Sequence, residues 1–378
     1  MSNSGEKLNI KEIVEHLSPN TIMYVEGLKK YFGLRRSLTE VIRRRPPRFV
    51  RAVDGVKFFI RKGEVFGLVG ESGCGKTTTG KLLVRLYEPT GGSIIFKPKE
   101  ETLMAYGEQM LSDDIFYNGY VDLAKIPTKR FNPFRREIQI ILQDPYGALN
   151  PRYKIVDSLE EPLIIHKIAD SREERMNIVA KALEDVKLIP PEDFMERYPH
   201  MLSGGQRQRV ALARSLVLNP SFIVADEPVS MLDVSLRAEI LEMMMEVKKK
   251  YGLTYLFITH DLAVARYICD RIAVMYLGKV VEMSESDNVI YDPLHPYTKA
   301  LLIAVPDLDP YLKEKIVEVP IKGEVPSAVN IPLGCRFHPR CVALDQHPEL
   351  KEKCTKEEPP LIEAKPGHYV ACWLYEKQ

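Results

Sequence analysis

The sequence lacks any long hydrophobic run. Within its 378 residues, no apolar stretch approaches the roughly 20 residues that a helix needs to cross a bilayer. Its first six residues, Met1–Glu6, also lack the charged and apolar pattern of a signal peptide. We therefore expect a cytosolic chain that acts at a membrane only through a partner.

An excess of charge of one sign is also lacking. Lysine and arginine together number 53 against 52 acidic residues, so the formal net charge is +1. This balance gives no global bias toward nucleic acid, and we expect no nucleic-acid partner. A chain of this length can bury a full α/β core and still carry a small appendage.

A glycine-rich segment supplies the first motif. Residues 70–77 read GESGCGKT, which fits the G-x-x-x-x-G-K-[ST] pattern of a phosphate-binding loop. The loop lies between a predicted buried strand, 65–69, and a predicted helix, 78–87. Its amides would wrap phosphates, while Lys76 would meet the β- and γ-phosphates and the Thr77 hydroxyl would bind Mg²⁺. The predicted nucleotide-binding residues of this segment are Gly70, Ser72, Gly73, Cys74, Gly75, Lys76, Thr77 and Thr78.

Two carboxylates follow a second predicted strand. Residues 222–225 are apolar and end in Asp226 and Glu227. We expect Asp226 to hold Mg²⁺, and Glu227 to orient or deprotonate an attacking water.

A helix start is predicted at residues 202–206, which read LSGGQ. Ser203 can cap the helix, and Gln206 can return a hydrogen bond in a capping box. Gly204 and Gly205 have no Cβ and allow another body to approach the backbone closely. The N-terminal amides and the helix dipole then suit an anion.

Together these motifs resemble those of ABC-type ATPases. In that family the LSGGQ pentapeptide is the signature, which grips the γ-phosphate of ATP held by an opposing subunit. The resemblance implies that Ser203, Gly204, Gly205 and Gln206 act on the ATP of a partner. One phosphate loop, one signature and one acidic strand end make half of a two-site ATPase.

The resemblance extends to four further positions. Gln143, after the strand-like segment 138–142, resembles the Q-loop residue that touches the metal and the lytic water. His260 resembles the switch histidine that contacts the γ-phosphate, and Asp233 lies in the place of the D-loop. Met231 stands where the family usually has a small residue, which changes the fine geometry expected at the dimer seam. Phe32, or its neighbour Tyr31, is in the position that would stack on adenine.

The fold implied is an α/β P-loop NTPase of the ABC ATPase type. It comprises a doubly wound, mainly parallel sheet, an antiparallel β subdomain, a helical subdomain at about 144–215 and a small Cys-rich C-terminal extension. We expect the nucleotide-binding domain to cover 1–320 and the extension to cover 321–378. Two insertions stand out: an arginine-rich segment, 35–51, expected to be a solvated loop rather than a lipid contact, and 97–130, which could form an extra hairpin or lobe.

Residues 292–302, DPLHPYTKALL, resemble a segment in the ATPase subunits of oligopeptide and dipeptide importers. This narrower resemblance implies two membrane permeases, an extracellular solute-binding protein and a second ATPase, identical or paralogous, at the cytoplasmic face of the cell membrane. Some members serve oligosaccharides instead of peptides. The alternative is a soluble ABC ATPase acting on nucleic acid or ribosomes. Those proteins usually carry two ATPase units or long insertions between the motifs, which this chain lacks.

Four of the six cysteines lie in the C-terminal extension, separated by 5, 12 and 17 residues. Two disulfides are not expected in a cytosolic protein, whereas four thiolates suit zinc or an iron–sulfur cluster. Spacing alone does not choose between the metals. The resemblance implies a [4Fe–4S] cluster, with zinc as the runner-up and unligated thiols third, and with a structural or a redox-sensing role. The expected ligands are Cys335, Cys341, Cys354 and Cys372.

Overall fold

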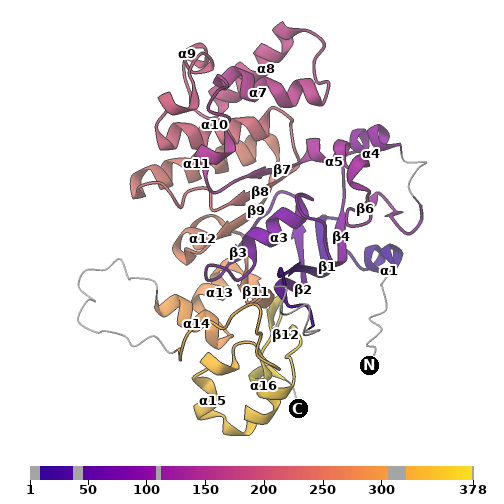
Figure 1. The fold of residues 1–378 in the computed structure, drawn as a ribbon, viewed down its shortest axis with the longest axis vertical. Helices are drawn as coiled ribbons and strands as arrows, with labels where there is room; N and C mark the ends of the chain where they lie inside the picture. Colours follow the sequence, from indigo (N-terminus) through magenta and orange to yellow (C-terminus); the bar gives the residue numbers. More distant parts are fainter. Residues whose placement is uncertain (1–8, 37–45, 108–111, 305–320, 377–378) are drawn as a thin grey trace.

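The larger of two sheets has eight strands, and its centre is parallel. The computed structural model describes residues 9–36, 46–107, 112–304 and 321–376. Within these, the strand order is β12-β13-β11-β10-β3-β9-β8-β7, and β10, β3, β9, β8 and β7 run parallel (Figure 1). The strands are β3 (Val65–Val69), β7 (Ile138–Ile141), β8 (Phe222–Asp226), β9 (Thr254–Thr259), β10 (Arg271–Tyr276), β11 (Lys279–Glu285), β12 (Ile362–Lys365) and β13 (His368–Val370).

The second sheet is antiparallel and has five strands in the order β2-β1-β4-β6-β5. The insertion 97–130 contributes β5 and β6, so the extra hairpin expected there extends this sheet. Residues 37–45 of the arginine-rich segment lie outside the described residues. The strands are β1 (Thr21–Gly33), β2 (Phe49–Arg61), β4 (Gly91–Phe96), β5 (Phe116–Tyr117) and β6 (Tyr120–Asp122).

Short helices and turns form a separate lobe beside the β7 edge of the larger sheet (Figure 1). Proline breaks the lobe into pieces, as at Pro190-Pro191, where α9 begins. The helical subdomain expected from the sequence corresponds to this lobe. Its elements are α6 (Pro145–Ala148), α7 (Ile155–Ile165), α8 (Arg172–Asp185), α9 (Pro191–Met195), η3 (Pro199–Met201) and α10 (Gly204–Leu216).

The remaining helices cover the sheets or belong to the C-terminal part, and none of the described helices is long and apolar enough to cross a membrane. They are α1 (Ile10–Glu15), α3 (Lys76–Leu83), α4 (Glu100–Tyr106), η2 (Thr128–Arg130), α5 (Asn132–Glu137), α11 (Val234–Tyr251), α12 (Leu262–Ile268), α13 (Ser286–Tyr291), α14 (Pro296–Ile303), η5 (His338–Arg340), α15 (Ala343–Gln346), η6 (Pro348–Leu350), α16 (Lys351–Lys356) and η7 (Trp373–Tyr375).

Helix α3 packs closely on the parallel sheet, and a glycine makes the approach possible. A Cβ at Gly80 would lie 2.8 Å from side-chain carbons of both Ile258 and Val224. Phe66 and Leu68 of β3 are fully buried between this sheet and the antiparallel one. Burial of this apolar surface holds β3 and α3, and therefore the loop between them, in a fixed position.

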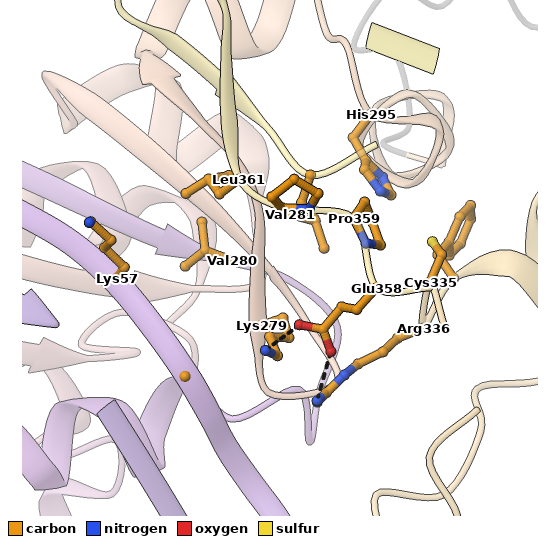
Figure 2. A pocket seen from close by; sticks show the side chains of 14 residues that line it. Lys57, Lys279, Val280, Val281, His295, Cys335, Arg336, Glu358, Pro359 and Leu361 are labelled. Atoms are coloured by element: carbon orange, nitrogen blue, oxygen red, sulfur yellow. Dashed lines mark ion pairs between the residues drawn. The ribbon is translucent and has the colours of Figure 1, made fainter. Parts of the chain in front are cut away.

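The residues after 320 join the larger sheet at one edge. Strand β13 pairs antiparallel with β11, and β12 pairs with β13. The buried His368 lies with its Nε2 2.7 Å from Glu282 of β11. Glu358, which precedes β12, forms ion pairs with Lys279 of β11 at 2.5 Å and with Arg336 at 3.7 Å. These three side chains line a cavity of about 140 Å³ (Figure 2).

Candidate functional site

The segment predicted to bind phosphate forms the turn between β3 and α3. Gly70 has φ +153°, and a Cβ there would lie 2.2 Å from the carbonyl oxygen of Met275. Gly75 has φ +111°, and its Cβ would lie 2.2 Å from the carbonyl oxygen of Ala52. Both positions therefore require glycine. The buried Lys76 donates from Nζ to the carbonyl oxygens of Gly70 (2.7 Å) and Glu71 (3.0 Å), so the loop curls around its own lysine.

The other predicted residues of the loop differ in exposure. Ser72 and Gly73 are exposed at the tip, and Thr78 is half-buried in the first turn of α3. Cys74 is buried, which raises the pKa of its thiol, and its Sγ lies 3.9 Å from Nζ of Lys76. Burial makes Cys74 a packing residue of the loop, whereas the exposed tip leaves backbone amides accessible to phosphate.

An oxygen pair suited to Mg²⁺ lies where α3 meets the end of β8. The hydroxyl of Thr77 donates to Oδ1 of Asp226 at 2.9 Å. Burial raises the pKa of Asp226, with the neighbouring Glu227 adding to the effect, while the hydrogen bond from Thr77 opposes it. Hydroxyl and carboxylate oxygens are ligands that Mg²⁺ prefers, and a cation there would favour the charged carboxylate.

Two of the predicted catalytic side chains, Gln143 and His260, meet on the carboxylate of the third, Glu227. Oε2 of Glu227 accepts a hydrogen bond from Nε2 of Gln143 at 3.2 Å and lies 3.1 Å from Nδ1 of His260. Glu227 has φ +47°, which is uncommon for a residue other than glycine. Its amide donates to the carbonyl oxygen of Ile258 at 2.9 Å, and its carbonyl oxygen accepts from Oγ of Ser230 at 3.0 Å. These bonds hold a strained backbone, as is common at active sites.

The predicted capping box at the start of α10 is present. Ser203 Oγ accepts from the amide of Gln206 at 3.2 Å, and Gln206 Oε1 accepts from the amide of Ser203 at 3.0 Å. A Cβ at Gly204 would find Leu232 as its nearest neighbour at 3.7 Å, and one at Gly205 would lie 3.5 Å from Leu236. Those are ordinary contacts. Unlike Gly70 and Gly75 of the phosphate loop, these two are not required by packing within the chain.

The signature and the phosphate loop belong to different parts of the chain. Helix α10 lies in the helical lobe with α7 and α8, whereas α3 lies beside the larger sheet (Figure 1). The structure therefore does not bring Ser203, Gly204, Gly205 and Gln206 together with Lys76. Asp233, predicted to lie near the dimer seam, caps α11 by accepting from the amide of Leu236 at 3.1 Å.

The two aromatic candidates for adenine stacking are at the end of β1. Phe32 is half-buried and meets Tyr87 edge to face, with ring centroids 5.4 Å apart. The hydroxyl of Tyr31 donates to Asp54, and burial with this bond raises the tyrosine pKa to about 12. A cation lies near each ring: Nζ of Lys30 is 5.2 Å from the ring centroid of Phe32, and the guanidinium carbon of Arg51 is 5.8 Å from that of Tyr31.

The four cysteines of the C-terminal part line one cavity, and none forms a disulfide. Burial, with the charges of neighbouring thiolates, raises the pKa of Cys335 and of Cys372 to about 12. The same cavity has apolar walls that include Phe337, Leu344 and Trp373. Among the described residues, however, no three His, Cys, Asp or Glu side chains are arranged closely enough to form a metal-binding group.

The contact of the C-terminal part with the phosphate loop is not predicted by the sequence motifs. Arg340 binds the carboxylate of Glu71 through two hydrogen bonds, and the amide of Glu71 donates to the hydroxyl oxygen of Tyr297 at 2.9 Å. Glu71 occupies a variable position of the loop motif. Its acidic side chain within an anion-binding loop is the one signal that could have indicated a basic partner.

Comparison with known proteins agrees with the motifs. Residues 53–230 match the ABC transporter family, and residues 281–347 match the oligopeptide/dipeptide transporter C-terminal region. The chain is 43% identical to the oligopeptide transport ATP-binding protein AppF of Bacillus subtilis, over 94% of this chain and 98% of the relative. It is 42% identical to the dipeptide transport ATP-binding protein DppF of Haemophilus influenzae, over 92% and 94% of the two chains.

Solved structures show the same fold. A dimeric ATP-binding cassette in a post-hydrolysis state, bound to ADP and phosphate, superimposes with a TM-score of 0.56 and 26% identity. The match covers 70% of this chain and 99% of that one. The predicted α/β cassette fold is thereby confirmed.

Proposed function

We propose that this chain, which belongs to the ABC transporter family with an oligopeptide/dipeptide transporter C-terminal region, hydrolyses ATP to power import of peptides through partner permeases. One observation carries the proposal. Gln143 and His260 meet on the Glu227 carboxylate, and Thr77 bonds the adjacent Asp226, next to a phosphate loop. Such a set orients water beside a bound triphosphate.

Each residue has a defined task in this mechanism. Lys76 and the loop amides bind the β- and γ-phosphates, and Phe32 stacks on adenine. Thr77, Asp226 and Gln143 would hold Mg²⁺, which would neutralise phosphate charge. Glu227 accepts the proton of the attacking water or orients it, while His260 steadies that carboxylate and contacts the γ-phosphate. Catalysis is then mainly positioning and electrostatic stabilisation.

The site would be completed by a second ATPase subunit, identical or paralogous. Ser203, Gly204, Gly205 and Gln206 would meet the ATP held by that partner, and Asp233 would lie at the seam. The separation of α10 from α3 within one chain supports this arrangement. Closure around two ATP molecules and reopening after hydrolysis would move two permeases at the cytoplasmic face of the membrane.

The division of labour along the chain is also a proposal. Residues 1–320 would form the nucleotide-binding domain, with the helical subdomain at about 144–215 as the part that contacts the permeases. Residues 321–378 would form the C-terminal extension. Peptide is favoured over oligosaccharide as the solute because the two relatives described above are oligopeptide and dipeptide transport proteins.

Transport can be tested in proteoliposomes that contain this chain, its second ATPase and the two permeases. We expect the solute-binding protein loaded with a short peptide to raise the ATPase rate severalfold, and the same protein offered an oligosaccharide to leave the rate unchanged. Stimulation by the oligosaccharide alone would reverse the solute assignment. Stimulation by DNA or ribosomes, with none from either solute, would support the soluble ATPase instead.

We further propose that Cys335, Cys341, Cys354 and Cys372 hold a [4Fe–4S] cluster, with zinc as the runner-up. An all-sulfur donor set in a cavity with apolar walls supports this assignment. To bind a metal, the four thiols must lie closer together than they do in this structure and must lose their protons. Burial raises the pKa of Cys335 and Cys372, so loss of these protons is unfavourable when no metal is bound. The cluster would then tie together the short helices of the extension.

The metal assignment predicts the composition of the purified protein. After anaerobic purification we expect about four iron and four sulfide per chain and broad absorbance near ~400 nm. Cys341→Ser should remove most of the iron and lower the thermal stability of the extension. Cys269→Ser is the matched control, because Cys269 is buried at the C-terminal end of α12 and outside the cavity. A colourless protein with stoichiometric zinc would establish the runner-up.

A further inference from the structure

Arg340 of the extension reaches the phosphate loop from the far end of the sequence. Its Nη1 and Nη2 donate to the two carboxylate oxygens of Glu71 at 2.9 and 3.2 Å. This is a bidentate, charge-assisted pair, the strongest geometry available to an arginine and a carboxylate. The Arg340 side chain is 7% exposed and that of Glu71 is 28% exposed, so the arginine is buried while water reaches the pair from the carboxylate side.

The guanidinium group of Arg340 lies over the ring of Tyr276, 5.8 Å from its centroid. Phe337, one turn before Arg340, packs edge to face on Tyr276 and also contacts Tyr297, with centroids 5.4 and 5.5 Å apart. Tyr297 accepts the hydrogen bond from the amide of Glu71. Both the side chain and the backbone of Glu71 are thus anchored to residues that follow the cassette motifs.

Glu71 presents an electrostatic problem to an anion-binding loop. Its carbonyl oxygen accepts from Nζ of Lys76 at 3.0 Å, so its backbone is part of the lysine cradle that would receive phosphate. A free carboxylate on this residue would repel a triphosphate. The pair with Arg340 cancels that charge and fixes the side chain on the side of the extension.

We propose that Arg340 is a positioning residue for ATP binding: it neutralises Glu71 and holds its carboxylate away from the phosphate-binding face of the loop. The proposal rests on the assignment of Gly70–Thr77 as the nucleotide site. Through Arg340 the extension would directly affect nucleotide affinity, although Arg340 lies outside all of the cassette motifs. The electrostatic origin distinguishes it from a simple brace, because removing the carboxylate should compensate for loss of the arginine.

The test is the Kd of Mg-ADP, measured by calorimetry on the full-length chain. We expect Arg340→Met to raise the Kd by about tenfold at low salt, and by less at high salt, where repulsion is screened. Glu71→Gln alone should change it by less than about threefold, and the double variant should resemble Glu71→Gln. Lys322→Met, which removes an exposed lysine paired with Asp345 in the same extension, is the matched control.

The outcomes separate the proposal from its premise. Loss of binding in Lys76→Ala confirms the nucleotide site, and an unchanged Kd in that variant would overturn the site assignment itself. If Lys76→Ala loses binding while Arg340→Met binds like wild type, only the role of Arg340 fails. The role also fails if the double variant binds as weakly as Arg340→Met, since a mechanical brace would give that result. Arg340→Lys, which keeps the charge, should bind more tightly than Arg340→Met.

Discussion

Glu227→Gln is expected to bind Mg-ATP as tightly as wild type and to lose most turnover, with kcat lowered about 10²- to 10⁴-fold. The amide keeps the size of the carboxylate but cannot accept a proton. The hydrogen bond from Gln143 and the contact with His260 both converge on Oε2 of this carboxylate. Steady-state ATPase assays together with nucleotide binding measure the two effects separately.

A matched control is available at Glu246. This glutamate is exposed and pairs with Lys187 on the surface of α11, so Glu246→Gln makes the same chemical change away from the nucleotide. We expect its kcat to stay within about twofold of wild type, because exposed ion pairs contribute little. A Glu227→Gln variant with a similarly normal kcat would remove Glu227 from the mechanism.

Ser203→Ala is expected to lower kcat about 10²-fold while leaving the Kd for ATP of its own chain unchanged. The hydroxyl would donate to the γ-phosphate held by the opposing subunit, and one lost donor to developing charge has about this effect. The change also removes a helix cap, which costs about 1 kcal/mol of stability. Activity assays and thermal unfolding of the same preparation distinguish the catalytic loss from the loss of stability.

The cap contribution can be measured independently at Ser171. This serine caps α8 of the same lobe by accepting from the amide of Glu174 at 3.1 Å. Ser171→Ala should show a similar loss of stability with normal kcat. If both alanine variants lose activity to the same extent, Ser203 acts as a helix cap and has no part in the chemistry.

The cassette site was largely predictable because its residues lie in short local motifs. A strand, a glycine loop and a helix place Lys76 and Thr77 without any knowledge of the rest of the chain. Asp226 and His260 follow buried parallel strands, and the ends of neighbouring parallel strands meet at one edge of a sheet. The order β3-β9-β8 in the sheet places Thr77 near Asp226 and Glu227 near His260.

The extension was less predictable because its contacts are distant in sequence. Arg340 and Glu71 are 269 residues apart, and neither the pairing of β13 with β11 nor this ion pair has a local pattern. The irregular cysteine spacing likewise gave no geometry. The shared cavity of the four thiols depends on the packing of several short helices, which no single segment specifies.

The proposed division of the active site between two subunits is tested most directly by sedimentation of the Glu227→Gln chain, alone and mixed with the second ATPase proposed as its partner. Because this variant should trap bound ATP, Mg-ATP is expected to convert the 43.2-kDa monomer to a dimer. Adding Ser203→Ala should weaken that dimer without weakening ATP binding. The shared site would be contradicted if the wild-type chain hydrolyses ATP while it remains a monomer. In that case the specific rate would not depend on protein concentration.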